Sequence, residues 1–182
     1  MNTIKKTFAI LLFAIMMPLL ASAQDSPIPI RLEITKIEAN NGQTQLEAFQ
    51  FIKDGVSSYY LSVGHLGVGD EIVQIQFDPL FELFIPLGDT LGEAIEKMED
   101  MKDYFDKSSN EYFEIPGCLA FGFPNDDRQT VTVVPRRVLF TRNLIFKLEY
   151  DGYERNTYVA RSNFMSILSG LKFYKTLHPE ED

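Results

Sequence analysis

The chain has little of the residues that most often form disulfides, metal sites and catalytic centres. It contains one cysteine, no tryptophan and two histidines among 182 residues. A single cysteine excludes a disulfide within the chain, and its apolar neighbours predict that Cys118 is a buried, inert thiol. His65 and His178 have no second histidine or cysteine at the spacing of metal ligands. The sequence therefore predicts neither a bound metal nor a cofactor.

Complete catalytic motifs are also missing. The chain has no G-x-S-x-G motif, and the glycines of "GHLGVGD" do not have the order of a dinucleotide-binding loop. His65 with Asp70 could act as an acid/base pair, and so could two of the many carboxylates. These residues keep open an alternative function, an extracytoplasmic hydrolase that acts on cell-wall or glycan substrates.

Long apolar runs occur only near the N-terminus. Lys5 and Lys6 precede "FAILLFAIMMPLLASA", whose last three residues fit the small-x-small pattern of a signal peptidase site. We therefore expect residues 1–23 to be a signal peptide that is cleaved after Ala23, and the protein to be secreted or periplasmic. Gln24 takes the place of a lipid-bearing cysteine, and no later segment is apolar over the roughly 20 residues of a bilayer span. We expect no membrane anchor after cleavage.

The remaining residues have the composition of a folded domain. Hydrophobic residues make up 45% and aromatic residues 13% of the chain, which favours a packed core over disorder. We expect a single secreted α+β domain over residues 24–178 and an acidic tail over 179–182. Two halves, 31–107 and 111–178, each resemble a run of strands followed by a helix, but no residue-level repeat connects them.

Hydrophobic periodicity predicts the fold class. Period-2 segments occur in groups, and each group is followed by a period-3.6 stripe, which favours α+β over alternating βαβ units. The prediction is a mostly antiparallel β-sheet, for which a curved or barrel-like form is one option, with two amphipathic helices at about 90–107 and 162–177.

Local signals predict four details. Residues 31–77 have the pattern of a four-stranded antiparallel meander, and 78–90 that of a bridge with a short strand at 81–85. Thr90 and Glu93 fit a capping box, and Ser162 fits the N-cap of the last helix. An Asp-Gly turn at 151–152 would place Leu148 opposite Arg155 in a hairpin.

Charge is distributed unevenly along the chain. Residues 25–127 hold 6 Lys and Arg against 20 Asp and Glu, whereas residues 128–178 hold 9 against 3. The formal net charge of the whole chain is -9. A molecule of this charge repels nucleic acid at long range, so we expect no nucleic-acid partner.

The basic residues concentrate in "RQTVTVVPRRVLFTRNLIFK", residues 128–147, which carries five positive charges and no negative one. In a regular strand Arg136 and Arg137 point to opposite faces, unless Pro135 introduces a bulge. Pro135 also predicts an edge strand, and Arg142 is predicted in the connection to the next strand. The favoured interpretation is a charged edge that discourages aggregation, and the alternative is a binding surface.

Tyrosines on the predicted hairpins extend the candidate binding surface. Tyr153 and Tyr158 join Arg136, Arg137 and Arg142 as candidate binding residues, because a phenol ring offers both contact area and a hydrogen bond. The sequence thus predicts a secreted, non-catalytic binding or interaction module. A protein or glycan partner fits this prediction, and self-association stays open.

Overall fold

The computed structural model describes residues 28–39, 44–64, 67–69, 74–77, 82–120, 122–124, 127–138, 140–150 and 152–179. These residues form one β-sheet and two α-helices. The strands are β1 (Ile30–Ala39), β2 (Thr44–Lys53), β3 (Val56–Val63), β4 (Gly67–Gly69), β5 (Gln74–Phe77), β6 (Leu83–Gly88), β7 (Phe113–Ala120), β8 (Arg128–Val138), β9 (Thr141–Tyr150) and β10 (Tyr153–Ala160). The helices are α2 (Leu91–Asp103), which continues as a 3-10 turn η2 (Tyr104–Asp106), and α3 (Arg161–Leu177).

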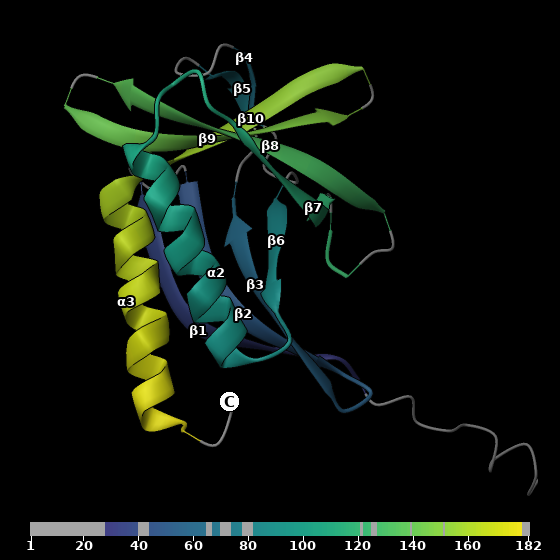
Figure 1. Ribbon diagram of the computed structural model, residues 1–182. Helices are drawn as coiled ribbons and strands as arrows, with labels where there is room; N and C mark the ends of the chain where they lie inside the picture. Colours follow the sequence, from purple (N-terminus) through teal and green to yellow (C-terminus); the bar gives the residue numbers. More distant parts are fainter. Residues whose placement is uncertain are drawn as a thin grey trace, which may run out of the picture.

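The described strands form a ten-stranded sheet in the order β1-β2-β3-β6-β7-β8-β9-β10-β4-β5. Every described pair is antiparallel. The sheet curls, so that β8, β9 and β10 cross above the upright strands β1, β2, β3 and β6, and both helices lie side by side in front of those upright strands (Figure 1). The predicted α+β class, with a curved antiparallel sheet and two helices, is confirmed.

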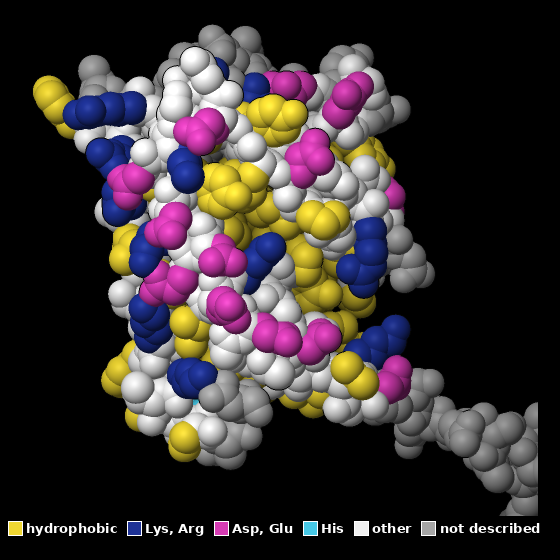
Figure 2. Space-filling model, in the orientation of Figure 1, with side chains coloured by type: hydrophobic (Ala, Val, Ile, Leu, Met, Phe, Trp, Pro, Cys, Tyr) yellow, Lys and Arg dark blue, Asp and Glu magenta, His cyan; other side chains and the backbone are white. Residues whose placement is uncertain are grey.

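Helix α2 begins at the predicted capping box. The Thr90 hydroxyl accepts a hydrogen bond from the Glu93 N–H at 3.2 Å, and the Glu93 carboxylate accepts one from the Thr90 N–H at 3.3 Å. Its apolar stripe is buried, and its opposite face carries the band of acidic side chains that Figure 2 shows over α2. The helix predicted at 90–107 is confirmed by α2 and η2.

Helix α3 is confirmed, but its predicted cap is wrong. The N-cap position belongs to Ala160, which makes no side-chain cap, and Ser162 lies inside the first turn. The reason is that β10 continues directly into the helix, which leaves no connecting residue for a polar cap. Gly170 lets α3 approach β1 closely, since a Cβ at this position would lie 2.5 Å from the Thr35 hydroxyl oxygen.

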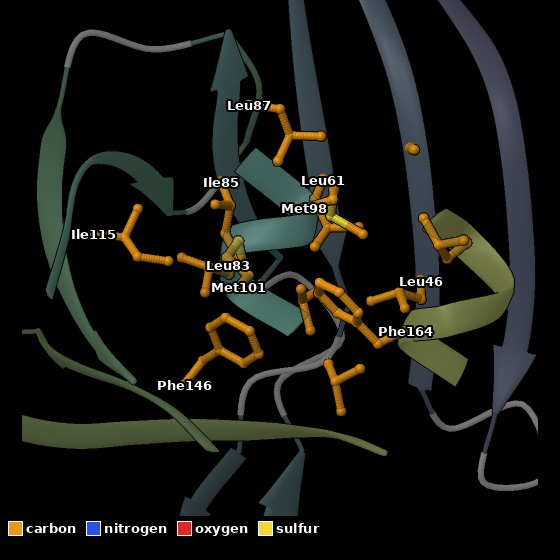
Figure 3. Packing of buried hydrophobic residues seen from close by; sticks show 14 of the residues in the cluster. Leu46, Leu61, Leu83, Ile85, Leu87, Met98, Met101, Ile115, Phe146 and Phe164 are labelled. Atoms are coloured by element: carbon orange, nitrogen blue, oxygen red, sulfur yellow. The ribbon is translucent and has the colours of Figure 1, made fainter. Parts of the chain in front are cut away.

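The main core fills the space between the helices and the inner face of the curled sheet. Leu46 of β2, Leu61 of β3 and Ile85 of β6 meet Met98 of α2 and Phe164 of α3 (Figure 3). Strands from both halves of the chain contribute, because the inner residues of β7, β9 and β10 belong to the same cluster. Cys118 is completely buried there, and burial raises the pKa of its thiol to about 12. The prediction of an inert thiol agrees with this environment.

A second, smaller cluster lies on the opposite face of the sheet. Successive residues of a strand point to opposite faces, so Phe49 lies there while Ala48 belongs to the main core. Arg31 stacks 4.0 Å above the Phe49 ring and donates hydrogen bonds of 2.9 and 3.2 Å to the Glu47 carboxylate. We call this the Arg31 cluster; its members are Arg31, Glu47, Phe49, Phe51, Tyr60, Phe84, Leu119 and Phe123.

The hairpin of β9 and β10 has the predicted register. Tyr150 pairs with Tyr153, and Leu148 pairs with Arg155. Leu148 faces the main core, as the alternation predicts, whereas Lys147 and Glu154 pair on the other face at 3.3 Å. A two-residue turn fixes the register of a hairpin, which is why local sequence suffices here.

The predicted four-stranded meander is wrong beyond β3. The short strands β4 and β5 pair with each other and with β10, at the far end of the sheet. The place next to β3 belongs to β6, within the segment predicted as a bridge. Leu83 and Ile85 of β6 are fully buried, and Pro86 is tolerated because the described β7 ladder pairs only Leu83 and Phe84.

Candidate functional site

A pocket of about 360 Å³ opens where the end of α2 meets the hairpin of β8 and β9. Its apolar lining residues, Phe105 and Pro135, are buried, and most of its other lining side chains are cationic. The charged lining consists of Lys107, Arg136, Arg137 and Arg142, with Asp106 as the one carboxylate among the described lining residues. We call it the arginine pocket.

The hairpin positions two arginines face to face. Arg137 pairs directly with Arg142 across the β8–β9 ladder, two residue pairs beyond Pro135. Like charges placed opposite each other in a sheet destabilise it, so this pair does not help the hairpin to form. Both side chains are exposed enough to meet a ligand at the mouth of the pocket.

Arg136 and Arg137 lie on opposite faces of β8, and both line the arginine pocket. Burial alternates through Val131, Val133 and Pro135, and Arg137 continues this inner face beyond the end of the core. Arg136 lies on the outer face, yet it reaches the same pocket. The described pairing of β7 with β8 ends at Val133. Arg136 therefore lies in a part of β8 that has no described pairing with β7.

Two predictions about this segment are therefore corrected. Pro135 predicts an edge strand, but β8 lies inside the sheet, between β7 and β9. The proline fits because the described β7 partner stops two residues earlier. Arg142 is predicted in a connection, but it belongs to β9, which begins at Thr141. The turn between the two strands is shorter than the sequence suggests.

Asp106 of η2 connects three elements at the side of the pocket. Its carboxylate accepts a hydrogen bond from Arg161 of α3 at 2.9 Å and forms an ion pair with Arg142 of β9. Phe105, the residue before it, packs edge-on against Phe164 with ring centroids 5.3 Å apart. This contact anchors η2 in the core and so holds the carboxylate in position.

Charges elsewhere on the described surface are more evenly matched. The Glu99 carboxylate of α2 accepts hydrogen bonds from Lys102 and from Lys172 of α3, and these bonds hold its pKa below the usual value. Arg31 is matched by Glu47, and Lys147 by Glu154. In the arginine pocket, four cationic side chains accompany one carboxylate. The pocket is thus a local positive site on an acidic protein.

Of the remaining candidate residues, Tyr158 is the one whose side chain the structure describes, and it does not join this pocket. Tyr158 is half-buried on β10, opposite Ile145, and it is not part of the lining. The side chain of Tyr153 lies outside the described part of the structure, as do His65 and Asp70. The hydrolase alternative that rests on His65 and Asp70 therefore stays a prediction.

Sequence reasoning missed the partners that α2 and its following loop bring to the arginines. In the sequence, Asp106 and Lys107 are two charged residues at the end of an amphipathic helical pattern. Their position after an amphipathic helix gives no signal that the helix ends against the hairpin of β8 and β9. The basic block makes Arg136, Arg137 and Arg142 visible in the sequence, and all three line the arginine pocket.

Among the described residues, no group of three or more His, Cys, Asp and Glu side chains is placed to bind a metal ion. No described helix combines the length and the apolar character needed to cross a membrane.

Comparisons with known proteins give no assignment. No protein family model matches the chain, and neither the curated proteins nor the solved structures contain a match to it.

Proposed function

We propose that the protein is a secreted, non-catalytic binding module that holds an anionic group of its partner in the arginine pocket. The observation that carries the proposal is the Arg137–Arg142 pair, in which two like charges face each other at a pocket with one carboxylate. Such a pair costs stability, and local conflicts of this kind are typical of functional sites. The N-terminal segment that ends at Ala23 supports a location outside the cytoplasm.

Guanidinium chemistry defines the group that the pocket would bind. Two arginines can each donate two parallel hydrogen bonds to a carboxylate, sulfate or phosphate. The pocket volume of about 360 Å³ lies near the lower end of the range of roughly 300–1,000 Å³ that is typical of small-ligand sites. An anionic side group of a protein or a glycan therefore fits better than a large free ligand.

The acidic surface around the pocket disfavours the binding of anions elsewhere on the protein. Figure 2 shows acidic side chains over α2, whereas Lys and Arg side chains gather beside α3 and toward the tip of the β8–β9 hairpin. A net charge of -9 repels anions from most of the surface, so an anionic partner is directed to the positive site. Binding should weaken with salt, because the site is exposed to solvent.

Titration with inorganic sulfate tests the pocket directly. We expect the purified protein to bind sulfate saturably with a Kd of roughly 1 mM or weaker, which corresponds to about 4 kcal/mol of binding free energy or less. In the variant with Arg137→Gln and Arg142→Gln, affinity should fall by about ten-fold or more, because both bidentate donors are lost. NMR shifts of the backbone amides around the pocket report the binding.

Arg128→Gln is the matched control. Arg128 belongs to the same basic block, but it donates a hydrogen bond to the Gly117 carbonyl and is not among the residues that line the pocket. This variant should bind sulfate as the unmodified protein does. If the unmodified protein shows no saturable shift at the pocket, or if the double variant binds equally well, the proposed function is wrong.

A further inference from the structure

A second pocket, of about 450 Å³, adjoins the arginine pocket. The two pockets share Ser109 and Arg136, so they form one continuous surface around the loop between η2 and β7. We call the second one the tyrosine pocket; its other lining residues are Asn110, Glu111, Tyr112, Thr132, Val134 and Lys147.

Hydrogen bonds and a ring contact support the loop that separates the pockets. At its base, Tyr104 stacks on Phe113 with ring centroids 3.5 Å apart. Within it, the Glu111 carboxylate accepts a hydrogen bond from the Ser108 N–H at 2.7 Å, and the Ser108 carbonyl accepts one from the Glu111 N–H at 3.0 Å. These contacts reduce the ordering that the loop needs when a ligand binds, which favours affinity.

The lining chemistry of the tyrosine pocket suits a sugar ring. Tyr112 is 66% exposed, and its ring offers an apolar surface beside the hydroxyls and the amide of Ser109, Asn110 and Thr132. A sugar presents both an apolar face and a ring of hydroxyls, so an exposed aromatic ring beside hydroxyl and amide groups complements it. The charged lining residues are Arg136, Lys147, which pairs with Glu154, and Glu111, whose carboxylate accepts the Ser108 N–H.

An added peptide strand fits this surface less well. The β8 backbone beyond Val133 lacks a β7 partner among the described residues, and a peptide could in principle extend the sheet there. Pro135 lies in that segment and has no N–H to donate. Strand addition depends on a regular series of main-chain hydrogen bonds, so the proline disfavours it.

We propose that the two pockets together bind an acidic oligosaccharide. An anionic substituent of one sugar lies among Arg137 and Arg142, and the ring of a neighbouring sugar lies on Tyr112. Arg136, which lines both pockets, contacts the segment between them. The inference rests on the proposed function, since it takes the arginine pocket as the anion site and adds the class of the partner.

Binding of short acidic oligosaccharides tests this inference. We expect a hexamer of galacturonic acid or a sulfated hexasaccharide of the chondroitin type to bind about ten-fold more tightly than hexaglutamate, because only the sugars use Tyr112. The two sugars distinguish carboxylate from sulfate as the preferred anion. Isothermal titration calorimetry at one fixed salt concentration measures all three.

Tyr112→Ala should lower the affinity for the preferred oligosaccharide about five-fold or more, whereas Tyr112→Phe, which keeps the ring, should change it less than about two-fold. Sulfate binding should be unaffected by either substitution, because Tyr112 is not part of the arginine pocket. If neither sugar binds better than hexaglutamate, or if Tyr112→Ala has no effect, the oligosaccharide inference is wrong. The arginine pocket would then stand or fall on the sulfate titration alone.

Discussion

Arginine occupies two different environments at two places on the same sheet. In the Arg31 cluster, one guanidinium has an aromatic ring below it and a carboxylate that accepts two of its hydrogen bonds. In the arginine pocket, four cationic side chains surround one carboxylate, and two arginines face each other across a hairpin. The first arrangement is matched within the protein and stabilises the fold. In the second, Asp106 pairs with Arg142, but cationic side chains still outnumber carboxylates among the described lining residues, so the pocket keeps a net positive charge.

Charged residues that stabilise the fold and charged residues that bind a ligand can be distinguished by two different measurements. A charge that is matched by its neighbours contributes to the free energy of unfolding, so its removal is measured by denaturation. A charge in an exposed pocket of net positive charge contributes little to stability, so its removal is measured by binding. Substitutions in the two regions should therefore affect different measurements.

The largest expected effect comes from removing the aromatic ring below Arg31. Phe49 is fully buried and contacts Tyr60, Phe84 and Phe123. Phe49→Ala should lower the free energy of unfolding by about 3–5 kcal/mol, because it removes a buried ring and leaves a cavity. Urea denaturation measures the change.

The other region offers the same substitution at an exposed position. Phe140 lies at the tip of the β8–β9 hairpin and is 94% exposed. Phe140→Ala should change the free energy of unfolding by less than about 0.5 kcal/mol. Equal losses of stability for Phe49→Ala and Phe140→Ala would contradict the assignment of the Arg31 cluster as a second core.

A smaller effect is expected from the ion pair itself. Glu47 is nearly buried and is bonded to Arg31 through both carboxylate oxygens. Glu47→Gln should cost about 1–3 kcal/mol of unfolding free energy, because it weakens charge-assisted hydrogen bonds in a partly buried site. Glu154→Gln is the control, since its pair with Lys147 is exposed and should contribute less than about 0.5 kcal/mol. If Glu47→Gln and Glu154→Gln lower the free energy of unfolding equally, the expectation that the more buried ion pair contributes more is wrong.

The sequence predicts this fold best where neighbours along the chain make the contact. The capping box at Thr90 and the register of the β9–β10 hairpin depend on a few adjacent residues, and both are confirmed. The position of β6 beside β3 and the pairing of β4 with β10 depend on distant segments. Alternation of apolar and polar residues predicts a strand but does not specify its partner, so these pairings were missed.

The residues of the arginine pocket differ in the same way in how far the sequence indicates them. The basic block makes Arg136, Arg137 and Arg142 visible in the sequence, because they are close together and no acidic residue interrupts them. Their convergence on one pocket depends on the end of α2, where Phe105 holds Asp106 beside the hairpin. Contact between segments so far apart follows from tertiary packing, which a single sequence does not reveal.

The smallest expected effect tests the balance of charge inside the pocket. Asp106 is the carboxylate that Arg142 and Arg161 share, and it competes with any incoming anion for Arg142. Asp106→Asn should tighten sulfate binding by about three-fold, because a nearby negative charge is removed at a solvent-screened distance. The free energy of unfolding should fall by less than about 1 kcal/mol, since the ion pairs are exposed. Sulfate titration of this variant measures the change, and weaker binding would instead show that Asp106 is needed to hold Arg142 toward the ligand.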